Sequence, residues 1–466
     1  MRSPETSIGG SAPFSALVGK ELRDLAAGRA FWVTLVLLAL LVGASFEQAV
    51  SLYSEASRAA VQTPLLARGL SPFDGVVVPT FGALYLAATF LLPFVVIRMV
   101  GAEKANGGLK LMLQMPYSPM AVIGAKLVAA LVAWIAMALI PMSALGAWLL
   151  MGGHLGSAET VNLLLGHLLY ALAITGIAML CAAASDNPST AAILALAATI
   201  GFWVLDFAAA GQGGIVQALA GLSLTQVLRS FERGLLSTAP ALAAVIASLG
   251  LVVIASVWLH SGRALARKVT LTAATVACVG IAVVAVTTVP MHRDMTEDHR
   301  NSFPPSETAG LRRLTAPLYV IVKLAPEDPR LVDFERGVLG KLRRTVPRLR
   351  VTIESESRTG LFETSDEHYG EIVLRYSGRE STTRSTGAGE VLPIIFELAG
   401  IAQPVLAASP PYPGYPLIAQ GAASRMWFFA ILPLLIVAMW AWNAGLFDRL
   451  RAATGSTKSN ATGERA

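Results

Sequence analysis

Long apolar runs separated by short polar segments make up most of this chain. A helix that crosses the hydrocarbon core of a bilayer needs about 20 predominantly apolar residues. Runs of this quality lie at roughly 31–46, 79–100, 121–151, 161–184, 189–210, 239–260, 269–290 and 427–446. The pattern therefore predicts a polytopic α-helical membrane protein with about eight transmembrane helices.

One segment between the last two apolar runs has a different pattern. Within residues 291–425, residues 318–322 form an apolar β-rich run, while 350–354 and 371–376 alternate between polar and apolar side chains. Helical spacing of apolar residues follows the first of these runs and recurs near 389–402. Strand, helix and strand in this order predict a small α/β domain with parallel pairing, placed between the last two transmembrane helices.

These patterns divide the chain into six parts. The expected parts are an N-terminal interfacial helix (1–30), a block of six spans (31–262), a seventh span (263–290), the α/β domain with its linkers (291–425), an eighth span (426–446) and a polar tail (447–466). Proline-rich residues 404–420 predict a semi-rigid linker into the last span.

Composition supports the membrane assignment. The chain of 466 residues is 54% hydrophobic and 14% charged, and its mean hydropathy is +0.61, whereas soluble domains carry roughly 25% charged residues. Segment 291–425 holds 17 basic and 17 acidic residues, so the net charge of +6 comes from the rest of the chain. In a membrane protein such an excess marks cytoplasmic loops, and we expect no nucleic-acid partner.

Lysine and arginine residues near the span ends predict the orientation. Cytoplasmic loops are enriched in these residues. With the N-terminus inside, the long cytoplasmic pieces are the richer ones, because they contain Lys20, Arg23 and Arg29, then Arg98, Lys104, Lys110 and Lys126, then Arg263, Arg267 and Lys268, and finally Arg449, Arg451, Lys458 and Arg465. We therefore expect both termini in the cytoplasm, residues 291–425 outside, and a location in the inner (cytoplasmic) membrane of the cell.

Sites for chemistry are scarce. A phosphate-binding loop needs a glycine-rich turn that ends in Gly-Lys-Ser/Thr, but the pair Gly19-Lys20 is followed by Glu21. Cys181 and Cys278 both lie in apolar runs and have no metal-ligand spacing. We expect no catalytic, cofactor-binding or metal site, and any ATP hydrolysis must occur on another polypeptide.

Two ionisable residues lie within predicted spans. Asp206 is near the outer end of the fifth span and His167 near the outer start of the fourth. Ionisable groups at such depths are candidates for a functional polar site, although an interfacial or packing role is the simpler interpretation. Their small number argues against a proton- or ion-coupled carrier.

Two segments on the predicted cytoplasmic side are amphipathic. Residues 14–29 combine apolar and charged positions in the manner of a helix that lies in the membrane interface. Residues 101–126 contain a charged start, a short amphipathic helix, a proline-flanked turn and a return into the membrane. From the residues alone, this second segment is either a docking surface or an ordinary linker.

The two segments also carry a family resemblance. Lys20-Glu21 and, in the second segment, Glu103, Gly108-Leu109, Pro116-Tyr117-Ser118 and Gly124-Ala125-Lys126 resemble the pattern of type-2 ABC transporter permeases. In that family the corresponding loop contacts the ATPase subunit. The resemblance thus implies a separate ABC ATPase as partner, a homodimer or heterodimer in the membrane, and docking residues Glu103, Gly108, Pro116, Ser118 and Lys126.

A weaker resemblance covers the remaining chain. Residues 223–235 are similar to the branch of gliding-motility and multicopper-enzyme-maturation permeases, and residues 269–446 are similar to the auxiliary subunit of the gliding-type system, with a shortened outside domain. The expected function is therefore the permease subunit of an ABC exporter. The alternative is a non-transporting membrane component whose outside domain senses or anchors cell-envelope material.

Overall fold

The computed structural model describes residues 14–115, 117–208, 223–260, 262–288, 291–325, 328–354, 368–404 and 412–445. Within these residues, eight helices are long and apolar enough to cross a membrane. They are α2 (Arg29–Gln62), the continuous run of η1 (Phe73–Val77), α4 (Val78–Phe90) and α5 (Leu92–Ala105), α7 (Pro119–Leu150), α8 (Ser157–Ala184), α9 (Pro188–Ala208), α12 (Thr238–Leu259), α13 (Leu265–Thr287), and the run of η3 (Gly421–Ser424), η4 (Trp427–Ile431) and α18 (Leu432–Asn443). The predicted polytopic helical membrane fold is confirmed.

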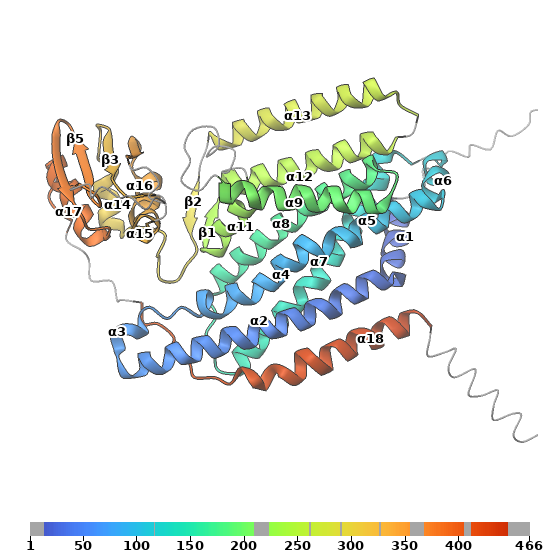
Figure 1. Cartoon of the computed structure of the whole chain (residues 1–466), viewed down its shortest axis with the longest axis horizontal. Helices are drawn as coiled ribbons and strands as arrows, with labels where there is room; N and C mark the ends of the chain where they lie inside the picture. Colours follow the sequence, from blue (N-terminus) through green and yellow to red (C-terminus); the bar gives the residue numbers. More distant parts are fainter. Residues whose placement is uncertain are drawn as a thin grey trace, which may run out of the picture.

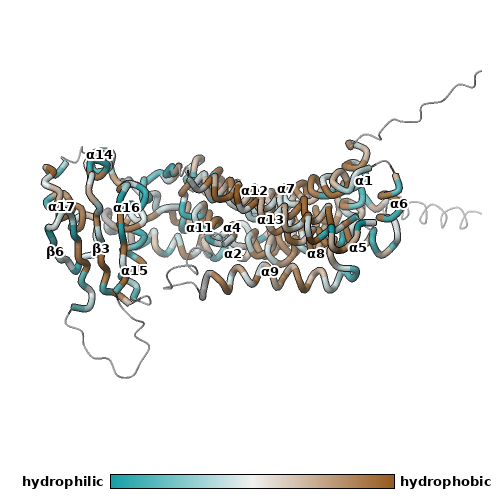
Figure 2. The backbone as a smooth tube through the Cα atoms, turned by 90° about the horizontal axis from the view of Figure 1, so that it is seen from above, coloured by the Kyte–Doolittle hydropathy of each residue, from teal (hydrophilic) through white to brown (hydrophobic). Residues whose placement is uncertain are grey.

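These helices lie side by side as an elongated bundle (Figure 1). Short elements lie at its two ends. Helices α1 (Phe14–Ala27) and α6 (Gly108–Gln114) are at one end, and α3 (Pro64–Ala67), α11 (Leu224–Glu232), β1 (Leu235–Ser237) and β2 (His292–Asp294) are at the other. Apolar residues dominate the middle of the bundle, and hydrophilic residues gather at its ends (Figure 2).

Helix α2 is much longer than its apolar run at 31–46. Its 34 residues extend over about 50 Å at 1.5 Å per residue, whereas the hydrocarbon core is about 30 Å thick. Polar residues such as Gln48 and Ser51 therefore do not end the helix, because beyond the core a helix can face water. The helix ends only at Gln62, and the backbone of Thr63, directly before Pro64, is extended.

The segment between the last two spans contains a four-stranded sheet of order β4-β3-β5-β6. Its strands are β3 (Leu318–Val322), β4 (Leu349–Ile353), β5 (Ile372–Tyr376) and β6 (Arg379–Thr383), and its helices are α14 (Pro305–Leu311), α15 (Pro329–Phe334), η2 (Glu335–Leu339), α16 (Gly340–Thr345) and α17 (Ala388–Ala399). Strands β3 and β4 pair in parallel, as predicted, and β5 is antiparallel to both of its neighbours.

This α/β domain has its own hydrophobic core. Alternate residues of β3, namely Leu318, Val320 and Val322, are fully buried, and they belong to a cluster with Phe334 and Ile395. The described members of this cluster all lie between residues 303 and 401, separate from the core of the bundle. A chain segment of about 100 residues can bury enough apolar surface to fold alone.

We therefore expect a fragment of residues 300–404 to be soluble and to unfold cooperatively. The fragment must include Phe303, which is 5% exposed within the core. Circular dichroism should show a mixed α/β spectrum and a single thermal transition. A disordered spectrum for the fragment would contradict a self-sufficient core.

The stability of this fragment should depend on the ionisation of Asp328. Its carboxylate accepts hydrogen bonds from the backbone N–H of Arg330 (2.9 Å) and the hydroxyl of Tyr369 (2.8 Å), and bonding to the Arg330 side chain is the main cause that lowers its pKa to about 2. Because the folded pKa is depressed, the stabilisation is complete above the unfolded value of about 3.9 and is lost as the pH falls toward 2. Asp328→Asn should lower the melting temperature most at pH 7, and the deficit should shrink toward pH 2. A deficit that does not change with pH would contradict this.

Both connections to the α/β domain are attached to the bundle. Strand β2 pairs antiparallel with β1. In the second connection, the carbonyl of Tyr415 accepts a hydrogen bond from the hydroxyl of Tyr53 (2.7 Å), and Ser54 exchanges hydrogen bonds with the backbone of Ala419. Residues 412–420 thus lie along the end of α2. This attachment was not expected from the sequence, which predicted a linker at residues 404–420.

Candidate functional site

Helix α1 buries one face that includes a carboxylate. Leu17, Glu21 and Leu25 are its buried residues, and their spacing of four places them on the same side. This side packs against α7, and Glu21 is 2% exposed. The amphipathic pattern predicted the helix, and the structure shows that its inner face contacts protein.

The partner of Glu21 is Lys126 on α7. The Nζ atom of Lys126 donates to both carboxylate oxygens of Glu21 (3.0 and 2.9 Å) and to the carbonyl of Met99 (2.8 Å). Lys126 is fully buried. Its Nζ atom also lies 2.6 Å from Oε2 of Glu103, which forms an ion pair with it but has no hydrogen bond of good geometry.

Two further charges complete the cluster. Lys20 forms ion pairs with Glu103, with Glu21 (3.1 Å) and with Asp24 (3.1 Å). Three helices thus meet through charged side chains, with two lysines and three carboxylates. Removing one member of a buried ion pair leaves an uncompensated charge, which typically costs about 3–5 kcal/mol. The cluster therefore fixes α1 to α5 and α7.

A surface helix lies directly beyond this cluster. Helix α6 follows Gly107, whose positive φ of 72° turns the chain sharply. Leu109 and Met112 are buried against the core, whereas Lys110, Leu111 and Met115 are exposed, Leu111 by 64%. This end of the bundle therefore presents a small surface that is apolar and basic.

The residues predicted to dock an ATPase fall into three groups. Gly108 is half-buried at the start of α6, and the exposed Ser118 caps α7 by accepting a hydrogen bond from the backbone of Ala121 (3.1 Å). Glu103 and Lys126 lie inside the charge cluster, behind the surface. Pro116 is outside the described residues.

A second set of polar contacts between helices at this end of the bundle was not predicted. The Nζ atom of Lys104 donates to the carbonyls of Ala183 (3.2 Å) and Ser185 (2.6 Å) and forms an ion pair with Asp186 (3.1 Å). Lys104 thus attaches the end of α5 to the end of α8. In the sequence, the lysine beside Glu103 indicated only a charged loop. Its contacts could not be predicted, because its partners are about 80 residues away in the chain.

The two candidate intramembrane residues are far less informative. His167 is buried in α8, its ring centroid lies 5.3 Å from that of Phe81, and its nitrogens have no hydrogen-bond partner among the described residues. Asp206 belongs to α9, but its side chain is outside the described part. Their joint role as a polar site stays a prediction.

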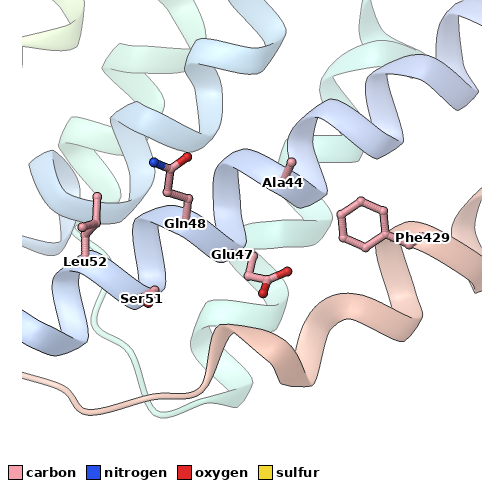
Figure 3. Close-up of a pocket in the computed structure, with 6 residues that line it drawn as sticks. All are labelled: Ala44, Glu47, Gln48, Ser51, Leu52 and Phe429. Carbon is pink, nitrogen blue, oxygen red and sulfur yellow. The ribbon is translucent and has the colours of Figure 1, made fainter.

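Two grooves lie on the bundle. One, of about 350 Å³, is beside the charge cluster and is lined by Asp24, Arg98 and Glu103 among others. The other, of about 360 Å³, lies between α2 and η4 and contains Gln48 and Phe429 (Figure 3). Glu47 in this second groove is paired with Arg425, so it offers no unpaired charge to a ligand.

The comparison with protein families identifies the part of the chain that holds the cluster. Residues 20–205 match the family model of the ABC-2 type transporter. This part of the chain is therefore similar to the membrane domain of ABC-2 type transporters. The match begins at Lys20 and includes α6 and the five spans from α2 to α9, and it supports a permease subunit of an ABC-type transporter. No curated protein and no solved structure matches the chain.

Proposed function

We propose that this chain is the permease subunit of an ABC exporter driven by a separate ATPase that docks on α6. The observation that carries the proposal is the arrangement at one end of the ABC-2 domain. There, the exposed side chains of Lys110 and Leu111 on α6, and of Met115 directly after it, adjoin a buried charge cluster. A docked partner would bury these apolar side chains, and the charge cluster would transmit the force that the partner exerts to the helices.

The mechanism follows from these contacts. ATP-driven closure of the ATPases pushes on α6, and α5 carries the displacement to Glu103. The pairs Glu103–Lys126 and Lys126–Glu21 then pass it to α7 and α1. Because buried ion pairs resist separation, the three helices move together between inward- and outward-open states. Two copies of the domain, in a homodimer or a heterodimer, enclose the pathway.

The orientation is part of the proposal. The lysine and arginine residues near the span ends favour cytoplasmic termini in the inner membrane, with the α/β domain outside. The separate core of that segment supports a distinct domain, and we propose from the sequence resemblance that this domain is a shortened auxiliary subunit of the gliding-type system, fused here to the permease.

Cysteine labelling tests the orientation. In a variant that lacks Cys181 and Cys278, single cysteines replace the exposed Thr382 on β6 or the exposed Gln114 on α6. A membrane-impermeant maleimide should label intact cells at position 382 and reach position 114 only after permeabilisation. Labelling in the reverse order would contradict the proposed topology.

The function itself is tested by its partner. The tagged full-length chain, purified from native membranes in a mild detergent, should retain a protein with a phosphate-binding loop that mass spectrometry identifies. The purified complex should hydrolyse ATP. If purification repeatedly yields no ATPase, the alternative, a non-transporting component that senses or anchors envelope material, becomes the better account.

A further inference from the structure

The α/β domain contacts the bundle along a seam that is rich in arginine. Its helices α14 to α16 lie on the side that faces α11 and β1 (Figure 1). Asn301 joins the two parts, because its Nδ2 donates to the carbonyl of Arg233 (2.7 Å) and its own carbonyl accepts from Nη2 of Arg344 (2.6 Å). Arg233 at the end of α11 is therefore only two hydrogen bonds from Arg344 on α16.

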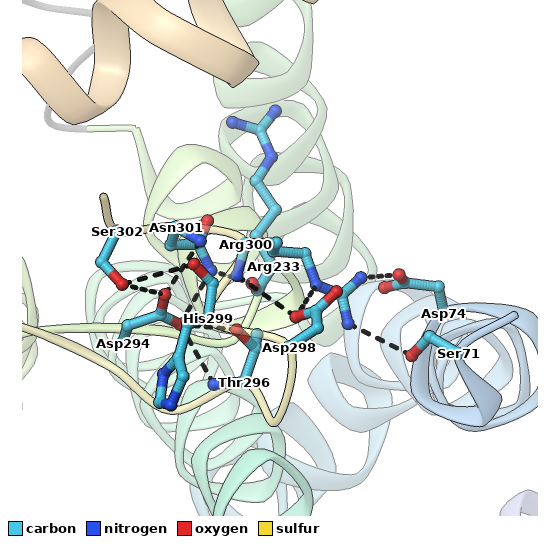
Figure 4. A network of polar contacts seen from close by, with 10 residues as sticks. All are labelled: Ser71, Asp74, Arg233, Asp294, Thr296, Asp298, His299, Arg300, Asn301 and Ser302. Carbon is cyan, nitrogen blue, oxygen red and sulfur yellow. Dashed lines mark hydrogen bonds and ion pairs between the residues drawn. The ribbon is translucent and has the colours of Figure 1, made fainter. Parts of the chain in front are cut away.

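Three arginines at this seam have no fixed counter-ion. Arg229 and Arg233 are exposed and four residues apart on α11, and Arg336 is exposed on η2. Among the described residues, none of these three side chains forms a hydrogen bond or an ion pair. Figure 4 shows the Arg233 guanidinium pointing away from the polar network that surrounds Asp294.

The acidic residues of the seam are already engaged. Asp294 accepts from the backbone of Asn301 (2.8 Å) and the hydroxyl of Ser302 (3.0 Å). Asp298 pairs with Arg300 and Glu335 with Arg343, each at 3.0 Å. Glu232 is one carboxyl beside two arginines, Arg229 and Arg233, and burial raises its pKa. The seam thus keeps an excess of positive charge.

The pKa values of the arginines indicate that their charges are close together. Burial lowers the pKa of Arg233, the charges of Arg336 and Arg229 lower it further, and the charges of Glu232 and Glu335 act in the opposite direction. Burial also lowers the pKa of Arg344, while the charge of Asp294 raises it and the charge of Arg233 lowers it. Cations held together at this density favour a bound anion.

The depth of the seam identifies the source of that anion. Helix α12 begins at Thr238 and has 22 residues, which span about 33 Å and match a hydrocarbon core of about 30 Å. Strand β1 directly precedes α12, and α11 precedes β1. The hydrogen bond from Asn162 to the carbonyl of Phe231 (3.1 Å) holds α11 against the end of α8. Arg233 therefore lies at the headgroup layer, and Arg229 lies one helical turn deeper, because the adjacent Leu228 packs against Tyr170 and Ile174 in the middle of α8.

We propose that Arg229, Arg233 and Arg336 bind the phosphate group of an anionic phospholipid from the leaflet that faces the α/β domain. A planar guanidinium donates two parallel hydrogen bonds to phosphate oxygens. Because the arginines come from α11 and from η2, one lipid headgroup joins the bundle to the α/β domain. This inference does not depend on the transport function or on the orientation of the chain.

Native mass spectrometry of the detergent-purified full-length chain tests this. Wild type should retain phosphatidylglycerol in preference to phosphatidylcholine. The double variant Arg233→Gln/Arg336→Gln should retain about tenfold less, which corresponds to about 1.4 kcal/mol. Arg379→Gln, at an exposed position of β6 away from the seam, is the matched control and should bind like wild type.

A further variant and a competing anion distinguish lipid binding from misfolding and from the binding of a soluble anion. Arg233→Lys/Arg336→Lys retains both charges without the planar guanidinium groups and should lose less lipid than the glutamine variant. An unchanged melting temperature of the glutamine variant shows that its loss of lipid is not misfolding. Equal retention of phosphatidylglycerol by wild type and the glutamine variant would overturn the proposal. Displacement of the lipid by millimolar inorganic phosphate would also overturn it and assign the seam to a soluble anion.

Discussion

Replacing Lys126 by methionine is expected to destabilise the detergent-solubilised protein by about 3–5 kcal/mol, because it removes the buried cation and leaves Glu21 and Glu103 with only the more exposed Lys20 as a counter-charge. Methionine is close to lysine in size, so the change removes the charge and keeps most of the packing. Helix α1 should then separate from α7. Thermal denaturation followed by size-exclusion chromatography measures the loss, and limited proteolysis detects the released helix.

Two further variants isolate the role of charge. Lys110→Met removes an exposed lysine on α6 and should have little effect on the melting temperature. Adding Glu21→Gln to Lys126→Met removes one of the uncompensated carboxylates and should recover part of the lost stability. If Lys126→Met were as stable as Lys110→Met, the cluster would not hold the helices together.

The second large effect is expected at the surface of α6. Leu111→Asp should leave the protein folded but lower recovery of the ATPase at least about tenfold. Burial of a leucine side chain contributes about 1.5–3 kcal/mol. Leu111 is 64% exposed and is not part of the hydrophobic core of the bundle. The measurement is the ratio of ATPase to permease after affinity purification.

The matched control uses a leucine at the opposite end of the bundle. Leu66 on α3 is 55% exposed, and Leu66→Asp should recover the ATPase as wild type does. An equal loss in both variants would indicate general destabilisation. Undiminished recovery with Leu111→Asp would place the ATPase contact elsewhere.

The bundle could be predicted from the sequence because hydrophobicity alone selects membrane-spanning helices. The hydrophobic pattern underestimated the length of α2. The residues of α2 beyond the bilayer core are polar and still helical, since a helix outside the core needs no apolar residues. Strand β6 was not predicted either. Its residues Arg379–Thr383 are polar, and the strand forms by pairing with the buried strand β5 across a turn at Ser377 and Gly378.

The charge cluster shows what a pattern in one segment cannot reveal. Glu21 lies about 80 positions before Glu103 and 105 positions before Lys126 in the chain, so its contacts with them depend on how the helices pack. One local signal was present. Glu21 lies midway between Leu17 and Leu25 on the buried face of α1, and a carboxylate on an apolar face needs a buried cation.

The family resemblance placed Glu103 and Lys126 in the docking loop, and the structure places both side chains behind its surface. Charge reversal at Glu103 would therefore disturb the packing of α1 as well as any docking. Substitutions of exposed residues on α6 separate these two effects.

Site-specific photocrosslinking in intact cells tests the central claim most directly. A photoreactive amino acid replaces Leu111, which is exposed on α6, or Leu109, which is 5% exposed on the opposite face of the same helix. The account predicts that position 111 cross-links to a polypeptide with a phosphate-binding loop and that position 109 reacts only within the chain. Absence of an ATPase from the products at position 111, with full-length protein present in the membrane, would contradict docking on α6.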